Sequence, residues 1–234
     1  MRTQFSFCLT LTALLSINLF AAEKATFIQN LDAGKTQTII TYGTSLTAAG
    51  AWVNQLGAEL EKRFPGRAKI INSAESGMWS KWGVDNLYKR VVEKTPDTVI
   101  IEFAINDAFL KYATTVDQAR QNLENMIERI NKARPASEII LMTMNVPIGE
   151  HFTKRPKIED YYEMYRDVAK HRHFLLIDHE PNWHKVLKQG ETDYKKFVPD
   201  GIHPNAEGCG KIILPELMSA LGLSPAPHAA APGL

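Results

Sequence analysis

The sequence predicts one α/β domain, a three-layer α/β/α sandwich in which helices cover both faces of a five-stranded parallel sheet. Five short apolar or β-branched runs alternate with amphipathic stretches, and this alternation is typical of parallel sheets. The chain has 234 residues, enough for one such domain with a substantial hydrophobic core. Apolar residues make up 44% and charged residues 23%, a balance that excludes a disordered chain or a multi-span membrane protein.

The predicted strands are apolar enough for burial on both faces, as is usual for parallel strands. They cover Thr38–Tyr42, Ala68–Asn72, Thr98–Phe103, Glu138–Met144 and Phe174–Asp178.

Between the strands, apolar residues recur at helical spacing. One stripe runs over Trp52–Phe64, a second over Val84–Val91 and a third over Val116–Ile130. We interpret these stripes as the faces that pack on the sheet. The last segment, Ala206–Leu221, contains two glycines and Pro215, so we expect an irregular or kinked helix there.

Both ends of the chain are expected to lie outside the domain, which we assign to residues 23–222. Arg2, an apolar run and small residues before Glu23 are typical of a secretory signal peptide, so residues 1–22 predict export to the periplasm or the exterior. An uncleaved membrane anchor is the alternative. The Ala- and Pro-rich residues 223–234 predict a disordered tail. Because no later run is long enough to span a membrane, we expect no stable membrane association after cleavage.

Charge and cysteine content exclude other classes. The chain has 27 Lys and Arg against 26 Asp and Glu, so it lacks the basic surplus that binding to nucleic acid requires. Cys8 lies in the N-terminal apolar run, and Cys209 is expected to be packed rather than reactive. Four histidines lack the spacing of a zinc motif and are expected on the surface, with no metal bound: His171, His173, His179 and His184.

Four polar motifs follow predicted strands. They are Gly43–Thr47, Asn72–Gly77, Ala104–Asp107 and, after a longer insertion, Asp200–Asn205. Ligands of open parallel sheets bind beyond the carboxyl ends of the strands. We therefore expect these motifs to meet at one edge of the sheet.

The motifs contain the residue types that acyl transfer requires. A serine hydroxyl becomes a nucleophile when an imidazole takes its proton, and a carboxylate holds that imidazole in place. Ser45, His203 and Asp200 are these three types. The developing oxyanion needs donors fixed in advance. The backbone N–H groups of Ser45 and Gly77 and the side-chain amide of Asn106 are candidates.

With these motifs the chain resembles the SGNH hydrolases, also called the GDSL esterase and lipase family, over residues 38–221. The resemblance implies a flavodoxin-like sandwich with strand order 2-1-3-4-5. It implies Ser45 as nucleophile, Asp200 and His203 as the rest of the triad, and Gly77 and Asn106 as oxyanion-hole donors. It implies no metal and no organic cofactor.

Two positions depart from the usual family pattern. The first motif commonly reads Gly-Asp-Ser, whereas Thr44 stands before Ser45 here, so another group must make the hydrogen bonds of the missing Asp. The third motif commonly begins with Gly, and Ala104 adds one methyl group near the oxyanion hole. Neither change removes a triad residue.

The predicted function is that of a serine esterase acting on a small-molecule or polysaccharide ester, a carbohydrate O-acetylesterase in particular. The absence of a long apolar lid segment and the export signal favour a small acyl group. Trp79 is positioned to stack on a sugar or, equally, to pack beneath its loop. Asn145 and Arg155 border the predicted site, and Arg155 is available for an anionic substrate.

Three alternatives stay open. Lysophospholipase, thioesterase and arylesterase activities also occur in the family. A non-catalytic flavodoxin-like domain would hold a phosphate at the hydroxyl-rich stretch Thr41–Thr47, but would leave Gly77, Asn106 and His203 unexplained. An inactive family member that only binds glycans is disfavoured because no triad residue type is missing.

Overall fold

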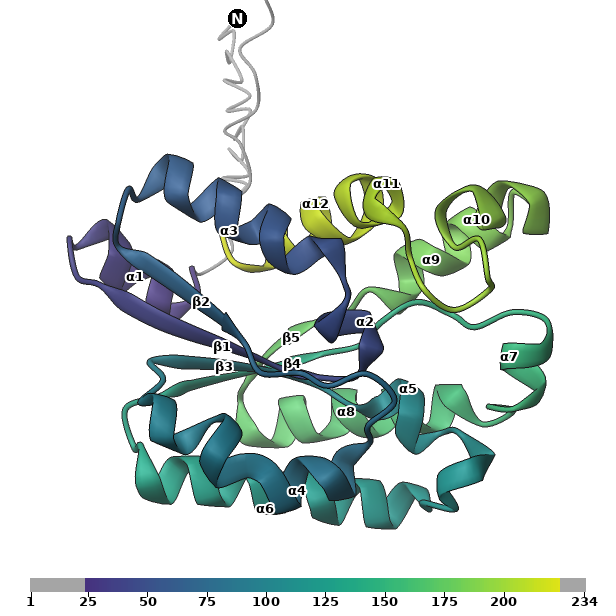
Figure 1. Cartoon of the computed structure of the whole chain (residues 1–234), viewed down its shortest axis with the longest axis horizontal. Coiled ribbons are helices and arrows are strands. Elements are labelled where there is room, and N and C mark those ends of the chain that lie inside the picture. The colour runs from purple at the N-terminus through teal and green to yellow at the C-terminus, as the bar shows by residue number, and fades with distance from the viewer. Residues whose placement is uncertain (1–23, 224–234) are drawn as a thin grey trace, which may run out of the picture.

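The computed structural model describes residues 24–223 and confirms the predicted fold class (Figure 1). The described residues form one parallel sheet with the expected strand order, β2-β1-β3-β4-β5. The predicted signal peptide and residues 224–234 of the predicted tail lie outside the described residues. The strands are β1 (Gln37–Gly43), β2 (Ala68–Asn72), β3 (Thr98–Glu102), β4 (Glu138–Met142) and β5 (Leu175–Ile177).

The two edge strands differ from the centre of the sheet. β3 is buried along its whole length and β1 along almost all of it, because each has a strand on both sides and helices on both faces. β2 and β5 keep partly exposed residues. The prediction that every strand is buried on both faces is therefore wrong for β2 and β5, which have a neighbour on one side alone.

Helices cover both faces of the sheet (Figure 1). α3 (Ala51–Arg63) and α12 (Leu214–Ala220) lie over one face, and α4 (Ser80–Arg90), α6 (Val116–Ala133) and α8 (Ile158–Arg172) over the other. The shorter helices are α1 (Thr26–Asp32), α2 (Ser45–Ala48), α5 (Ala104–Asp107), α7 (Glu150–Thr153), α9 (Glu180–Leu187), α10 (Glu191–Phe197) and α11 (Ala206–Gly208).

The predicted apolar stripes form the core. In α3, Trp52, Leu56 and Leu60 are fully buried. α6 buries its stripe in the same way and starts at a capping box, in which the Thr115 hydroxyl accepts from the Gln118 N–H and the Gln118 side chain accepts from the Thr115 N–H. The spacing of apolar residues thus predicted correctly which helix faces pack on the sheet.

The last helical segment is irregular, as expected. A π-helical turn, Cys209–Ile213, separates α11 from α12. Pro215 at the start of α12 has no N–H, so it cannot donate to the carbonyl of Lys211 one turn earlier. Cys209 is packed inside this segment, and burial raises the pKa of its thiol.

Hydrogen bonds tie the two ends of the described chain to the sheet and to each other. The N–H groups of Thr26 and Phe27 donate to the carboxylate of Glu138, the first residue of β4, at 2.8 and 3.1 Å. The Ala25 N–H donates to the Leu221 carbonyl at 3.4 Å. Leu223, expected in the tail, is buried, so the folded unit extends one residue further than predicted.

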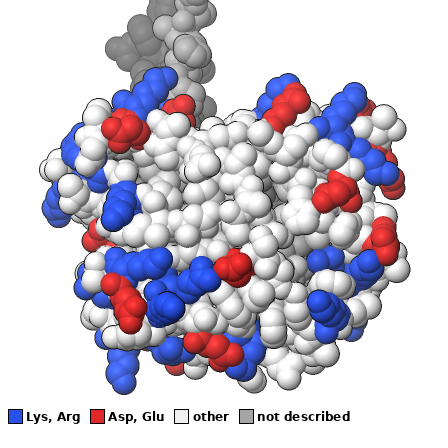
Figure 2. Space-filling view, in the orientation of Figure 1, with Lys and Arg blue, Asp and Glu red and all other residues white. Residues whose placement is uncertain are grey.

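The surface drawn in Figure 2 carries basic and acidic side chains close together around its rim and mostly uncharged residues at its centre. None of the helices between residues 24 and 223 is both long enough and apolar enough to cross a membrane.

Candidate active site

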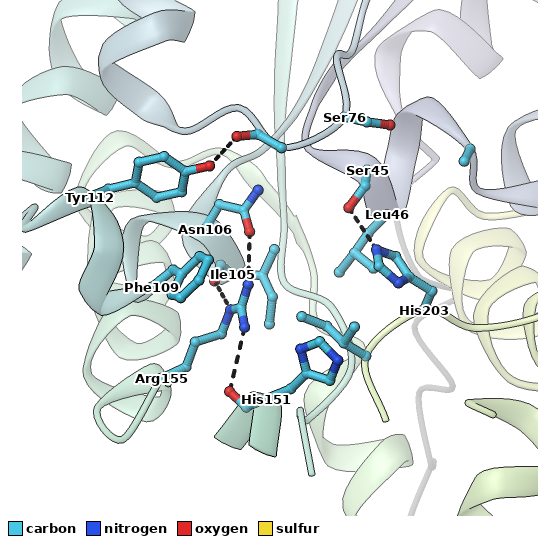
Figure 3. A pocket seen from close by; sticks show the side chains of 13 residues that line it. Ser45, Leu46, Ser76, Ile105, Asn106, Phe109, Tyr112, His151, Arg155 and His203 are labelled. Carbon is cyan, nitrogen blue, oxygen red and sulfur yellow. Dashed lines mark hydrogen bonds between the residues drawn. The ribbon is translucent and has the colours of Figure 1, made fainter. Parts of the chain in front are cut away.

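The four polar motifs meet at the carboxyl edge of the sheet, around a pocket of about 520 Å³ (Figure 3). One part of its wall is polar and another part is apolar. The polar residues are Ser45, Ser76, Gly77, Asn106, Tyr112, His151, Arg155 and His203, and the apolar ones are Leu46, Ala49, Ile105, Phe109 and Ile202.

Ser45, His203 and Asp200 form a chain of hydrogen bonds. The Ser45 Oγ lies 2.9 Å from His203 Nε2, and His203 Nδ1 lies 2.6 Å from the Asp200 Oδ2 (Figure 3 shows the first contact). With the imidazole proton on Nδ1, Nε2 is free to accept the proton of the Ser45 hydroxyl. The arrangement has the geometry that a nucleophile, a general base and an orienting carboxylate require.

Asp200 remains ionised over a wide pH range. Partial burial acts to raise its pKa, but hydrogen bonds from the His203 N–H, the His203 ring and the Ile202 N–H outweigh burial and lower the pKa to about 2. The two backbone groups donate to Oδ1 at 2.8 and 3.0 Å. The same carboxylate therefore holds both the loop and the imidazole.

Thr44 makes several hydrogen bonds in the turn that precedes Ser45. Its Oγ1 accepts from the Leu46 N–H at 3.2 Å and so caps the first turn of α2. The Thr44 hydroxyl also donates to the Glu102 Oε2 at 2.9 Å, and its N–H donates to the same oxygen at 3.1 Å. Gly43 is required beside this contact, because a Cβ there would lie 2.2 Å from the Glu102 carbonyl oxygen.

Sequence analysis missed Glu102. Its side chain is 1% exposed, and burial raises its pKa to about 8 despite hydrogen bonds from Thr44 and Thr47. The available signal was a single carboxylate at the end of an otherwise apolar strand.

The backbone N–H groups of Ser45 and Gly77 have no acceptor within the described part of the chain. Gly77 has φ of +75°, a conformation that residues with a Cβ rarely adopt. Its carbonyl accepts a hydrogen bond from the Tyr112 hydroxyl, which holds the loop in place (Figure 3). Both N–H groups thus remain available to a ligand in the pocket.

Asn106 lies on α5, with its side chain in the pocket wall. Its Nδ2 donates one hydrogen to the Met78 carbonyl at 2.9 Å, and its Oδ1 accepts from Arg155 Nη2 at 3.2 Å. One hydrogen of Nδ2 therefore remains for the pocket. Ala104, the other departure from the family pattern, is fully buried and does not line the pocket.

Two of the three expected substrate contacts do not reach the pocket. Trp79 stacks on Tyr112, with ring centroids 4.5 Å apart and planes 12° apart, and borders a neighbouring hollow instead. Asn145 is fully buried, and its Nδ2 donates to the Ile202 carbonyl at 2.9 Å, which holds the loop before His203. These two placements correct the expectation for Trp79 and Asn145, whereas Arg155 does line the pocket.

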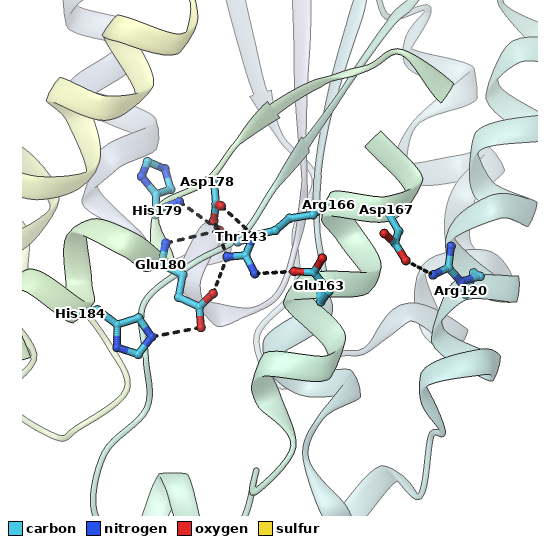
Figure 4. A network of polar contacts seen from close by, with 9 residues as sticks. All are labelled: Arg120, Thr143, Glu163, Arg166, Asp167, Asp178, His179, Glu180 and His184. Carbon is cyan, nitrogen blue, oxygen red and sulfur yellow. Dashed lines mark hydrogen bonds and ion pairs between the residues drawn. The ribbon is translucent and has the colours of Figure 1, made fainter. Parts of the chain in front are cut away.

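A second polar cluster lies around Arg166 (Figure 4). Glu159, Glu180 and His184 bring ligand atoms within 4.8 Å of one another, but Arg166 already bonds to Glu180, and none of these residues lines the pocket. We therefore assign no metal role to them.

His179, next to this cluster, was expected on the surface but is fully buried, so that prediction is wrong. Neither ring nitrogen has a hydrogen-bond partner among the described residues, and burial lowers its pKa to about 4.

The chain matches the model of the GDSL-like lipase/acylhydrolase family over residues 40–210. An arylesterase from Vibrio mimicus is 27% identical over 138 residues, which are 59% of this chain and 62% of the arylesterase. The chain therefore spans less than two thirds of that relative. Esterase TesA from Pseudomonas aeruginosa is 27% identical over 174 residues, 72% of this chain and 80% of that protein.

Solved structures share the fold. An α/β hydrolase from the metagenome of Lake Arreo superposes with a TM-score of 0.70 at 21% identity and covers 82% of this chain and 98% of its own. An acetylxylan esterase from Geobacillus stearothermophilus gives a TM-score of 0.70 at 20% identity over 80% of this chain and 95% of its own.

Proposed function

The chain belongs to the GDSL-like lipase/acylhydrolase family, a family of hydrolases that act on esters, and from this premise we propose that it is a serine esterase with Ser45, His203 and Asp200 as its triad. One observation carries the proposal. The hydroxyl of Ser45, both ring nitrogens of His203 and the Asp200 carboxylate lie in one chain of hydrogen bonds of 2.9 and 2.6 Å beside an open pocket.

In the first half of the reaction, Ser45 Oγ attacks the ester carbonyl carbon while His203 Nε2 takes the hydroxyl proton. Asp200 stabilises the imidazolium that forms. The carbonyl oxygen becomes an oxyanion and accepts hydrogen bonds from the N–H groups of Ser45 and Gly77 and from Nδ2 of Asn106. His203 then gives its proton to the leaving alcohol as the C–O bond breaks, and the acyl group stays on Ser45.

In the second half, a water molecule takes the place of the alcohol. His203 removes one proton from this water, and the hydroxide attacks the acyl carbon through a second oxyanion. Collapse of that intermediate breaks the bond to Ser45, which regains its proton from His203, and releases the carboxylate. No step requires a group beyond the residues named and water.

Within this activity, we infer a small acyl group on a carbohydrate as the preferred substrate. The fold shared with an acetylxylan esterase supports this reading, as does the mixture of polar and apolar residues in the pocket wall. Arylesterase activity is the second candidate, which the relative named arylesterase favours.

We also propose export, with residues 1–22 as a signal peptide. The charged start and apolar run of that segment support this. N-terminal sequencing of protein recovered from the periplasm and medium of a producing bacterium tests it. A new N-terminus near residue 23 is expected, and intact protein confined to the membrane fraction would indicate an anchor instead.

The decisive experiment compares wild type with Ser45→Ala and His203→Ala on p-nitrophenyl acetate. Each substitution is expected to lower kcat at least ~10³-fold, as loss of a triad residue does. Ser219→Ala and His171→Ala replace exposed residues outside the pocket and serve as matched controls. A serine-directed phosphonate should label wild type on Ser45, found by peptide mass spectrometry. Full turnover by Ser45→Ala would reject the triad.

Chain-length preference separates the two substrate classes. Initial rates are compared on p-nitrophenyl acetate, butyrate and octanoate, together with acetate release from acetylated xylan. Acetyl-selective, Ser45-dependent turnover with release from xylan supports the carbohydrate reading. Turnover of the p-nitrophenyl esters without acetate release from xylan supports arylesterase activity, and a preference for octanoate shifts the assignment to lipid substrates.

A further inference from the structure

Arg155 is a buried charged residue in the wall of the pocket, 4% exposed, in the loop between α7 and α8. Its guanidinium donates in three directions. Nε donates to the Ile105 carbonyl at 2.7 Å, Nη1 to the His151 carbonyl at 3.4 Å and Nη2 to the Asn106 Oδ1 at 3.2 Å (Figure 3). The group also lies over the ring of Phe109, 4.4 Å from its centroid. Arg155 is thus held rigidly against the residue proposed as an oxyanion donor.

The contacts of Asn106 fix which way its amide faces. A guanidinium can only donate, so the atom that faces Arg155 must be the oxygen. The Met78 carbonyl can only accept, so the atom that faces it must be the nitrogen. Both neighbours force the same orientation, in which Nδ2 points away from Arg155 (Figure 3). Without Arg155, the single hydrogen bond to the Met78 carbonyl would be the one that holds the amide in this orientation.

The charge of Arg155 has no neutralising partner nearby. Within residues 24–223, no ion pair includes Arg155, and its three acceptors are two carbonyls and one amide oxygen. A buried cation without a carboxylate is costly for folding. Such a charge is useful for catalysis when it lies beside a site where negative charge develops. A charged donor to Oδ1 of Asn106 polarises the amide, so the hydrogen bond that its Nδ2 donates becomes stronger.

We propose that Arg155 is a positioning residue for Asn106, which it orients and polarises so that Nδ2 donates to the oxyanion of the esterase reaction. The inference rests on the proposed function. It assigns Arg155 a role through Asn106, in place of the expected contact with an anionic substrate. Only an arginine can hold Ile105, His151 and Asn106 together, because lysine carries its donors on one nitrogen.

The two roles differ in kinetics. A residue that positions an oxyanion donor affects the transition state of every ester, so Arg155→Ala should lower kcat about 10²-fold on neutral p-nitrophenyl acetate, with KM within about threefold. A residue that binds an anionic substrate would affect KM on anionic esters alone. The experiment therefore measures kcat and KM on p-nitrophenyl acetate and on mono-p-nitrophenyl succinate.

A double-mutant cycle links Arg155 to Asn106. If Arg155 acts through Asn106, Arg155→Ala should cost little once Asn106→Ala is present, so the double variant should lie within about threefold of Asn106→Ala alone. Guanidinium ion, added well below denaturing concentrations, should restore part of kcat in Arg155→Ala but not in the double variant. Arg155→Lys keeps the positive charge but carries its donors on one nitrogen, so kcat should fall in this variant too.

Arg120→Ala is the matched control, since Arg120 is partly exposed and pairs with Asp167 away from the pocket. It should keep wild-type kcat. If Arg155→Ala does not fold, as judged by circular dichroism, Arg155→Lys and its cycle with Asn106→Ala provide the same comparison.

Three results would overturn the proposal: an unchanged kcat in the Arg155 variants, a loss confined to KM on the succinate ester, or losses that multiply fully in the double variant. Failure of the esterase assignment itself looks different, because wild type would then show no phosphonate labelling of Ser45 and no dependence on that residue.

Discussion

Arg155 and Arg166 lie eleven positions apart on the segment after β4, yet carboxylates neutralise the charge of Arg166 and not that of Arg155. Arg166 binds Asp178 through two bonds of 2.8 and 3.0 Å and also pairs with Glu180 and Glu163 (Figure 4). Hydrogen bonds to Asp178 raise the pKa of its guanidinium despite partial burial. Arg155 is more deeply buried and has uncharged acceptors alone.

The difference indicates what each cluster does. The Arg166 cluster satisfies its charges internally, so it joins α8 to the residues after β5 and has no unpaired charge to offer a substrate. The pocket around Asn106 keeps an uncompensated positive charge and free N–H groups, which lower stability but match a reaction that develops negative charge. Substitutions in the pocket should therefore change activity, and substitutions around Arg166 should change stability.

The strongest test of this division is Asn106→Ala. Loss of one oxyanion donor should lower kcat by about 10²–10³-fold, while the free energy of unfolding changes less than the activation barrier does. Asn106→Asp is the isosteric companion, which keeps the shape but replaces the N–H donor with a carboxylate beside Arg155, and it should be equally inactive. Steady-state kinetics and urea unfolding measure both quantities. Normal kcat in either variant would remove Asn106 from the mechanism.

Arg166→Met should have the opposite profile. It leaves Asp178 and the nearly buried Glu180 without their cation, so the free energy of unfolding should fall by about 3 kcal/mol. The kcat of the folded protein should stay at the wild-type value, because none of these residues lines the pocket. A large loss of kcat without a loss of stability would contradict the assignment of separate roles to the two clusters.

His179 beside the Arg166 cluster should make stability pH-dependent. Burial lowers its pKa to about 4 in the folded state, so its contribution is present above the unfolded-state pKa of about 6.5 and is lost as pH falls toward 4. At pH 5 this linkage costs about 2 kcal/mol. His179→Leu should flatten this part of the pH dependence of unfolding, whereas His171→Leu, at an exposed position, should not. Parallel curves for wild type and His179→Leu would show that folding does not shift the pKa of His179.

The smallest effect is expected from Tyr112→Phe. The Tyr112 hydroxyl holds the Gly77 carbonyl, a neutral counterpart of the contact between Arg155 and Asn106. Losing one neutral hydrogen bond costs about 1 kcal/mol, so kcat should fall about fivefold. The ratio of the kcat loss in Tyr112→Phe to the kcat loss in Arg155→Ala measures how much the charge of Arg155 adds to catalysis. An equal loss in both variants would mean that the charge of Arg155 contributes nothing beyond position.

The sequence could predict two kinds of feature. One is an element in which apolar residues follow one another or recur at helical spacing, and the other is a motif that directly follows a strand. Apolar runs gave the strands to within two residues at each end, and helical stripes such as that of α3 identified the packed faces. Motifs that follow strands were brought to one edge, because parallel strands carry them there. Burial of β2 and β5 was overestimated, since composition does not say which strand lies at an edge.

The remaining features depend on contacts between distant residues, which a local pattern does not encode. Asn145 was expected in the pocket because it follows β4, but its amide is required by the Ile202 carbonyl 57 positions later. Glu102 was correctly placed in a strand, but its hydrogen bond with Thr44 depends on the fold and could not be predicted from neighbouring residues. His179 looked exposed because histidine is polar, yet it follows β5 into the interior.

The bond between Ala25 and Leu221 joins two points almost two hundred residues apart on the side of the sheet where β4 begins. A polypeptide whose ends meet can be closed into a ring and opened elsewhere while every pairing is kept. Linking Leu223 to Lys24 and opening the exposed turn at Pro65 and Gly66 defines a circular permutant with the same sheet order. In such a permutant the pocket at the carboxyl edge of the sheet should stay intact, although the segments that line it would be synthesised in a different order.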